Sequence, residues 1–578
     1  MGTPPKFVRA ASIICGILIV GVTQLSLRAQ DKIHMKEPNK SNAPSYRNIR
    51  DYIWSGWDSL TRSPDDCKTY QDLKTSGEPT LYLPASFPRP AALGRLIQEK
   101  CQIDIETLPA SINSHGELDN SDIKPEGLLY LGHPYVVPGG QFNEMYGWDS
   151  YFIIRGLLAD GRVELAHGMV ENFFFEIEHY GAILNANRTY YLTRSQPPFL
   201  TSMILAVFEA QRARGVDDQE WLRRAYEFAV RDHTQWTNEP HLAGDTGLSR
   251  YFDHGEGPVP EIIGNPDSYY HAVAQFLALH GGPDEKYLVH PGQAGAKVIG
   301  AVFTVSRSCD GDAESKKTEN CMKPEEVALS SEYYKGDRSM RESGFDVSFR
   351  FGPFSADTHH YAPICLNSLL YKTEKDLAEI SKLLGNSQDA QRWERQAADR
   401  QRNIDKFLWD EKRGEYFDYD FTTNARSTYE FATTFYPLWA GLASESQAAA
   451  VMKNLRNFEQ PGGIAMSRFE SQSQWDYPYG WAPIHVLACE GMRRYGFNAD
   501  ADRVTSKFLD MVLQNFYRDR TIREKYDVVT RTSITHIVEG YAENVIGFGW
   551  TNAAFVILAA QLPSAARKNL ESENPARK

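Results

Sequence analysis

Apolar residues recur at three- and four-residue spacing through most of this 578-residue chain, and that spacing predicts helices. We expect helices at 151–158, 163–179, 201–215, 220–236, 268–280, 361–384, 390–408, 428–442, 445–457, 483–495, 499–516 and 548–562. The loops between them are rich in Gly, Pro, Trp and Tyr. Strands and helices do not alternate as they would in a parallel α/β fold. The pattern therefore predicts an all-α fold of helical hairpins, arranged as a barrel or a solenoid.

The remaining segments define the expected domain organisation. Residues 30–75 are polar and irregular, with a short helical patch near 49–60, and we expect a linker or lead-in segment there. The main domain is expected at 76–562, followed by a polar tail at 563–578. Residues 282–326 separate two helical segments and are expected to form an insertion on the surface.

The first residues of the chain have the pattern of a secretory signal peptide. Lys6 and Arg9 precede an apolar run at 10–22, and Ala29 stands where cleavage would occur. The run is short for a membrane-spanning helix. We therefore expect residues 1–29 to be a signal peptide and the protein to be periplasmic or secreted, with an uncleaved anchor as the alternative.

The composition excludes some partners and permits disulfides. The net charge of −13 argues against nucleic acid, whose binders usually carry basic patches. No stable membrane contact is expected once the signal peptide is removed. An exported chain could form disulfides between Cys67 and Cys101 and between Cys309 and Cys321. Cys365 and Cys489 lie in apolar runs and are expected to be buried thiols. No cysteine spacing suits a zinc site.

Five loops near expected helix ends combine aromatic residues with a carboxylate, an amide or an arginine. They are 138–152 (PGGQFNEMYGWDSYF), 185–198 (NANRTYYLTRSQPP), 341–351 (RESGFDVSFRF), 474–483 (QWDYPYGWAP) and 523–527 (REKYD). Flat rings beside a carboxylate suit a sugar, which has an apolar face and an edge of hydroxyls. The alternative for 474–483 is a packed aromatic corner in which Asp476 caps the next helix. In a helical barrel, loops at one end would converge on one pocket.

These motifs, with GFGWTN at 547–552, occur in the order in which they occur in the trehalase family of inverting glycoside hydrolases, which the chain closely resembles from about residue 135 to residue 552. The resemblance implies an (α/α)6 toroid with a small irregular N-terminal segment and loop insertions. It also implies hydrolysis of α,α-trehalose to two glucoses, without a cofactor or a metal.

An inverting glycosidase uses two carboxyl groups roughly 6.5–9.5 Å apart, one to protonate the leaving oxygen and one to activate water. The resemblance places the general acid at Asp346, in ESGFD, and the general base at Glu524, in REKYD. A partly desolvated pocket is expected to raise the pKa of Asp346 and so keep it protonated near neutrality.

The resemblance also implies a set of sugar-binding residues. They are Gln141, Trp148, Asp149, Asn185, Arg194, Ser195, Gln196, Glu261 and Gly344. Trp148 and Asn185 have a packing or turn role as the alternative. Arg188 and Arg350 are expected to brace loops by pairing with carboxylates, the commoner role of a buried arginine in such loops.

The chain departs from the family pattern at four positions. Gln141 and Val259 stand where the family has arginine, Phe345 where it has tryptophan, and Tyr541 at an expected glutamate. Of three usual arginines only Arg194 then remains. These departures leave two alternatives to a trehalase. One is a glycosidase of the same clan that acts on another α-glucoside or a glucosyl conjugate, and the other is a non-catalytic sugar-binding protein.

Overall fold

The computed structural model describes residues 46–71, 79–90, 93, 100–119, 121, 123–262, 266–308, 322–541 and 543–572. The long helices of this part are α1 (Tyr46–Leu60), α3 (Gly147–Ala159), α4 (Val163–His179), α5 (Leu200–Ala213), α6 (Gln219–Trp236), α7 (Pro266–His280), α8 (Ser331–Glu342), α9 (Ile364–Leu383), α10 (Ser387–Phe407), α13 (Ala482–Arg494), α14 (Asn498–Asp519) and α15 (Gly549–Gln561). Shorter helices are α11 (Tyr436–Ala440), α12 (Glu445–Asn454) and α16 (Ser564–Ser572).

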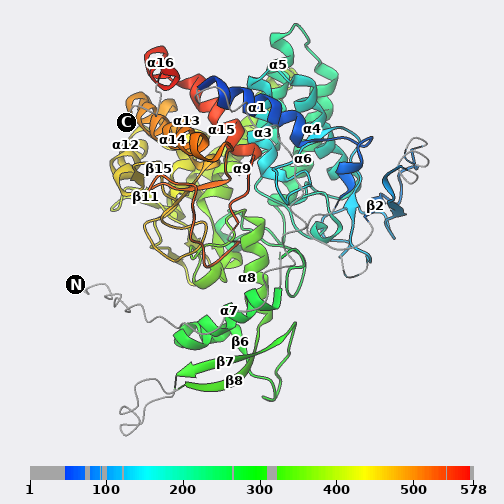
Figure 1. Ribbon diagram of the computed structural model, residues 1–578, viewed down its shortest axis with the longest axis vertical. Helices are drawn as coiled ribbons and strands as arrows, with labels where there is room; N and C mark the ends of the chain where they lie inside the picture. Colours follow the sequence, from blue (N-terminus) through cyan, green and yellow to red (C-terminus); the bar gives the residue numbers. More distant parts are fainter. Residues whose placement is uncertain are drawn as a thin grey trace.

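Helices α3, α5, α9, α11, α13 and α15 form a closed inner ring, because each contacts the next and α15 returns to α3. Helices α4, α6, α10 and α14 each pack against the inner helix that precedes them in the chain. Helix α1 packs against α15 (Figure 1). This arrangement is an (α/α)6 toroid, so the predicted fold class is confirmed.

Burial follows each helix's place in the ring. In α10 the buried residues recur at three- and four-residue spacing, from Ala390 through Trp393 and Ala397 to Ile404, so one face packs inward and the other meets solvent. In α15 nearly every residue is buried, because this helix has neighbours on all sides. Helix α15 approaches α3 closely: a Cβ added at Gly156 would lie 2.7 Å from the Cβ of Ala553.

The lead-in segment includes part of this core. Its expected helical patch is α1, in which Ile49, Ile53 and Trp57 are fully buried in the main hydrophobic cluster. The expected polar tail contributes α16, whose Leu570 packs into the same cluster. Helices α1, α15 and α16 therefore bring the two ends of the described chain together (Figure 1).

The strands of the described residues form small sheets in the connections. The two-stranded sheets are β1 (Thr61–Arg62) with β5 (Tyr135–Val136), β10 (Trp409–Asp410) with β11 (Glu415–Tyr416), and β14 (Glu459–Gln460) with β15 (Gly463–Ile464). In one three-stranded sheet, β2 (Thr80–Leu83) lies parallel to β3 (Asp104–Thr107) and β4 (Leu128–Leu129). In another, β9 (Tyr361–Ala362) and β13 (Ala425–Arg426) lie on either side of β12 (Tyr419–Asp420). The pair β16 (Tyr479–Trp481) and β17 (Lys525–Asp527) joins two of the predicted functional loops.

The expected insertion forms most of a separate layer. Strands β6 (Leu288–Val289), β8 (Met322–Leu329) and β7 (Val302–Ser308) make an antiparallel sheet that packs on α7, away from the ring (Figure 1). This layer has its own hydrophobic cluster, which includes residues of α8. Helix α8 was not predicted, because its sequence SEYYKGDRSMRE is mostly polar.

The cysteine predictions are confirmed where the structure describes them. Cys67 and Cys101 form a disulfide, and Cys365 and Cys489 are buried thiols. The proposed pair of Cys309 and Cys321 lies outside the described residues, as do residues 1–29. Within the described residues, no helix has the length and apolar character needed to cross a bilayer.

The role of α1 can be tested with two tryptophans of the same helix. Trp57 is fully buried and donates from Nε1 to Asp160 Oδ2 at 2.9 Å, whereas Trp54 is 51% exposed. We expect Trp57→Ala to lower the free energy of unfolding by about 3–5 kcal/mol, the usual cost of a cavity left by a large aromatic residue. Trp54→Ala should cost much less. Equal losses in urea denaturation would contradict a core role for α1.

Candidate active site

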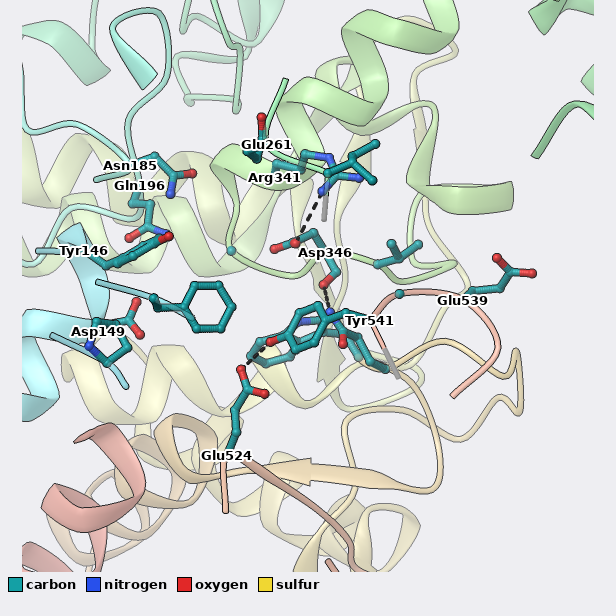
Figure 2. A pocket seen from close by; sticks show the side chains of 18 of the residues that line it. Tyr146, Asp149, Asn185, Gln196, Glu261, Arg341, Asp346, Glu524, Glu539 and Tyr541 are labelled. Carbon is teal, nitrogen blue, oxygen red and sulfur yellow. Dashed lines mark hydrogen bonds and ion pairs between the residues drawn. The ribbon is translucent and has the colours of Figure 1, made fainter. Parts of the chain in front are cut away.

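A cavity of about 440 Å³ lies where the loops that precede several inner helices meet. This volume is typical of a small-molecule site. Its wall includes residues from 138–149, 185–196, 261–262, 268–272, 341–347, 474–475, 524, 538–541 and 548–550. The structure therefore brings the five predicted loops together, and Figure 2 shows Asp149, Asp346 and Glu524 around the same space.

Asp346 follows the C-terminal end of α8. Its side chain is 32% exposed, and Oδ2 lies 3.7 Å from Nη1 of Arg341. Burial raises the pKa of Asp346 to about 6, although the charges of Arg341 and Arg194 act in the opposite direction. The backbone carbonyl of Asp346 accepts a hydrogen bond from Nε2 of Gln474. The protonated form of this carboxyl group thus persists to higher pH than in an ordinary aspartate, with half of it protonated at about pH 6.

Glu524 immediately precedes β17 and is almost completely buried. Its Oε1 accepts a hydrogen bond from the hydroxyl of Tyr541, and its Oε2 lies 3.5 Å from Nζ of Lys525. Oε2 accepts no hydrogen bond from any described residue. Burial raises the pKa of Glu524, while Lys525 and Tyr541 favour its ionised form.

Asp149 is the third carboxyl group of the cavity and stands in the first turn of α3. Burial and the nearby charges of Glu524 and Asp346 raise its pKa. The backbone N–H of Trp148 donates to Oε1 of Gln196 at 3.0 Å, which joins the start of α3 to the loop before α5.

A cluster of cations and anions faces these carboxyls. Arg194 pairs with Glu261 and donates from Nε to Oδ1 of Asn185 at 3.1 Å. Burial opposes ionisation of Glu261, but Arg194 and Arg341 outweigh it and lower the pKa of Glu261. Arg341 also lies 3.3 Å from Asp337.

Sequence reasoning missed Arg341 as a wall residue, so the described wall has a second arginine beside Arg194. The available signal was its place immediately before ESGFD, at the end of a helix that periodicity did not reveal. Tyr541 and Gln474, which contact Glu524 and the Asp346 backbone, were also not predicted as site residues.

Two predicted binding residues are absent from the described wall. Ser195 is fully buried, and its Oγ donates to the carbonyl of Ile183 at 2.5 Å. Gln141 lies in the turn between Gly139 and Phe142. Val259, the second departure from the family pattern, is also buried behind the wall, and its N–H donates to the hydroxyl of Tyr270.

Aromatic rings form one side of the cavity. Trp148 makes edge contacts with Phe345 and Trp550 at ring-centroid distances of 5.6 Å. Trp475 stacks on Trp481 at 3.9 Å and meets Phe345 edge-on. Trp148 therefore packs in an aromatic cluster and also lines the cavity, which combines the two roles considered for it.

Arginines outside the cavity brace the loops, as predicted. Arg188 donates from Nε to Oε1 of Glu144 at 2.8 Å. Arg350 donates to both oxygens of Asp418, at 2.8 and 2.6 Å. Both pairs are buried.

The 474–483 stretch holds the carboxyl-bearing loops in place. Asp476 accepts hydrogen bonds from the N–H of Phe349 at 2.9 Å and the hydroxyl of Tyr429 at 2.7 Å. The idea that Asp476 caps the next helix is wrong, because α13 begins after Trp481 without a side-chain cap. Since β16 pairs with β17, the same stretch also holds the segment of Glu524.

Paired carboxyl groups, hydrogen-bonding cations and aromatic rings around one cavity are typical of carbohydrate-active hydrolases. Comparison with known proteins identifies the class more closely. The trehalase family model matches residues 30–280 and 302–562. The chain therefore belongs to the trehalase family of glycoside hydrolases.

Individual relatives agree with this assignment. A cytosolic neutral trehalase of Beauveria bassiana is 36% identical over 88% of this chain and 72% of the relative. One of Emericella nidulans is 36% identical over 94% and 76%. The solved structure of neutral trehalase Nth1 from Saccharomyces cerevisiae matches with a TM-score of 0.73 and 34% identity, over 91% of this chain and 96% of that chain.

These relatives correct the expectation of export. Several that match most of the chain are named cytosolic, which contradicts the prediction of a signal peptide and of a periplasmic or secreted protein. A basic start and a short apolar run are features of composition alone. Leu27 also stands where a cleavage site has a small residue.

Gly344 offers a test of how the wall is held. Its φ of +76° is left-handed, and an added Cβ would lie 2.9 Å from the ring of Trp148. We expect Gly344→Ala to displace Trp148 and to change the near-UV circular dichroism. Gly385→Ala is the matched control, because Gly385 has a φ of +74° with nothing within 4 Å of an added Cβ. It carries the same backbone strain without the contact. Identical near-UV spectra for the two variants would contradict the steric argument.

Proposed function

We propose that this chain hydrolyses α,α-trehalose to two molecules of glucose by a single displacement with inversion. The observation that carries the proposal is the pair Asp346 and Glu524, which come from different loops and line one cavity. The trehalase family assignment and the names of the relatives support the substrate.

In this proposal Asp346 is the general acid. Its pKa of about 6 keeps a useful fraction protonated near neutrality, and the proton passes to the glycosidic oxygen as the bond to the anomeric carbon breaks. Arg341, 3.7 Å away, stabilises the carboxylate that remains after this transfer. Burial therefore favours the protonated form of Asp346 before the transfer, and Arg341 stabilises its carboxylate afterwards.

Glu524 is the general base in this proposal. Oε1 of Glu524 accepts a hydrogen bond from the hydroxyl of Tyr541, while Oε2 accepts none from the described residues. Oε2 is therefore the atom that takes a proton from the attacking water. Lys525 and Tyr541 favour the ionised form that a base needs. The water attacks the anomeric carbon from the face opposite the departing glucose.

The remaining wall residues bind the sugar. Asp149, Asn185, Gln196 and Glu261 offer oxygen acceptors to hydroxyl groups, and Arg194 and Arg341 offer fixed donors. Trp148 and Trp475 offer apolar surface to the ring faces. Gln141 and Ser195 act from outside the wall: the hydroxyl of Ser195 holds the loop that carries Asn185 and Arg194.

The alternative of another α-glucoside rests on Gln141 and Val259, and neither residue lines the cavity. Arg341 adds a second arginine to the wall, beside Arg194. A panel of trehalose, other α-linked disaccharides and glucosyl conjugates tests the choice. The proposal expects the highest kcat/KM for trehalose; trehalose at the bottom of the panel would overturn it. Tight sugar binding without turnover of any sugar would indicate the non-catalytic alternative.

The assigned roles predict the behaviour of two isosteric variants. Asp346→Asn and Glu524→Gln should each lower kcat by at least about 10²–10⁴-fold, the usual contribution of one acid or base. Trehalose binding, followed by the quenching of tryptophan fluorescence, should remain. Proton NMR of the first product of the parent enzyme should show one glucose of inverted configuration. Parental turnover by either variant would contradict its assignment.

The hydroxyl of Tyr541 predicts a shift in the pH profile. Its hydrogen bond favours ionised Glu524, so Tyr541→Phe should raise the pKa of Glu524. The acidic limb of kcat/KM, which reports the free enzyme, should then move to higher pH. Tyr52→Phe, which removes a hydroxyl that contacts Thr521 away from the cavity, is the control. An unchanged limb in Tyr541→Phe would show that this hydroxyl does not tune the base.

A further inference from the structure

A second cluster of polar side chains lies outside the cavity, where α8 meets the short helix η8 (Thr358–His360). Glu332 is the second residue of α8, and His359 and His360 end η8. Oε1 of Glu332 lies 3.0 Å from Nε2 of His359 and 2.8 Å from Nε2 of His360. One ligand atom from each of the three residues lies within 4.8 Å of the others.

Two imidazole nitrogens and one carboxylate oxygen are a donor set for a divalent transition metal. In a tetrahedral zinc site with bonds of about 2.0–2.1 Å, neighbouring donors are about 3.3 Å apart. The two separations from Oε1 of Glu332, 2.8 and 3.0 Å, are close to that value, and all three ligand atoms lie within 4.8 Å of one another. Glu332 is 44% exposed and His360 is 23% exposed, so a metal can reach the cluster from solvent and keep a water ligand.

We propose that Glu332, His359 and His360 form a binding site for one divalent transition-metal ion, such as zinc. The site is structural and separate from the cavity, because none of the three residues lines it. A bound ion would hold the start of α8 against η8. Helix α8 ends at Glu342, next to Arg341 and shortly before Asp346. An ion bound at the start of α8 would therefore stabilise the helix whose other end leads into Asp346.

Outer contacts orient the proposed ligands. Nδ1 of His360 lies 3.2 Å from Oδ1 of Asp357, so its Nε2 faces Glu332, in the carboxylate–histidine arrangement common at metal sites. Asp357 is itself held by Nζ of Lys286 at 2.8 Å, from the layer that contains α7. The carbonyl of His359 accepts a hydrogen bond from Arg250 at 3.0 Å, which fixes the backbone of η8. His359 is buried, so its ring has little freedom to turn away.

Zinc titration of the full-length chain, prepared without a polyhistidine tag and freed of metal by a chelator, tests this site. Isothermal calorimetry should show one zinc ion bound per chain. Zinc should also raise the Tm of the parent protein. Glu332→Gln and His360→Asn should each weaken this binding at least about tenfold and abolish the rise in Tm.

The control is His280→Asn, which removes an exposed histidine of α7 that contacts the carbonyl and the ring of Phe276 and lies outside the proposed site. It should bind zinc as the parent does. Glu332→Gln keeps the size of the side chain, so it remains informative if His360→Asn does not fold. Equal zinc affinity in Glu332→Gln and the parent, or no zinc binding by the parent at micromolar concentration, would overturn the proposal.

Discussion

The side-chain amide of Gln474 joins the two segments that carry the paired carboxyl groups. Its nitrogen donates to the carbonyl of Asp346, and its oxygen accepts from Nζ of Lys525, the neighbour of Glu524. An inverting displacement requires a fixed separation between acid and base, because water must fit on one side and the leaving sugar on the other. In the proposed mechanism, the side-chain amide of Gln474 helps to set the distance between the segment of Asp346 and the segment of Glu524. The backbone of Gln474 is in turn fixed by Trp481, whose indole Nε1 donates to the backbone carbonyl of Gln474 at 2.9 Å.

The charges of the site have to be stabilised by the rest of the fold. Buried ion pairs such as Arg194 with Glu261 seldom add net stability, since the loss of hydration offsets their attraction. The apolar contacts of the helical ring supply that stability instead. Asp149 shows the division within a single helix: it faces the cavity from the first turn of α3, and Ile153, Ile154 and Leu157 of the same helix are fully buried in the core. The ring can therefore support a polar, partly desolvated site that would not be stable alone.

Periodicity predicted outer helices such as α10 because they bury a regular face, and α4 was predicted with the bounds it has. It failed at α8, whose buried residues include Asp337, Arg338 and Glu342, polar groups satisfied by specific partners. Such burial depends on tertiary contacts that no local pattern contains. Arg341 was missed for the same reason.

Most of the binding residues predicted from the family motifs line the cavity. The motifs could not show which of these residues line it and which lie behind its wall. Ser195 belongs to the same RSQ motif as Arg194 and Gln196, yet its hydroxyl points to a backbone carbonyl. Doubt about the substrate centred on Gln141 and Val259, which do not line the cavity. Motif position thus predicted the neighbourhood of a side chain but not its direction.

The contact between α3 and α15 has a consequence for the order in which this molecule assembles. Gly156 and Ala553 meet although they are about 400 positions apart in the chain. Contacts of such large sequence separation form late and slowly. During synthesis the earlier hairpins emerge first, but the circle stays open until the last helices leave the ribosome. The faces of α3 and α13 that α15 covers stay exposed until then, and transiently exposed apolar surface of this kind favours aggregation.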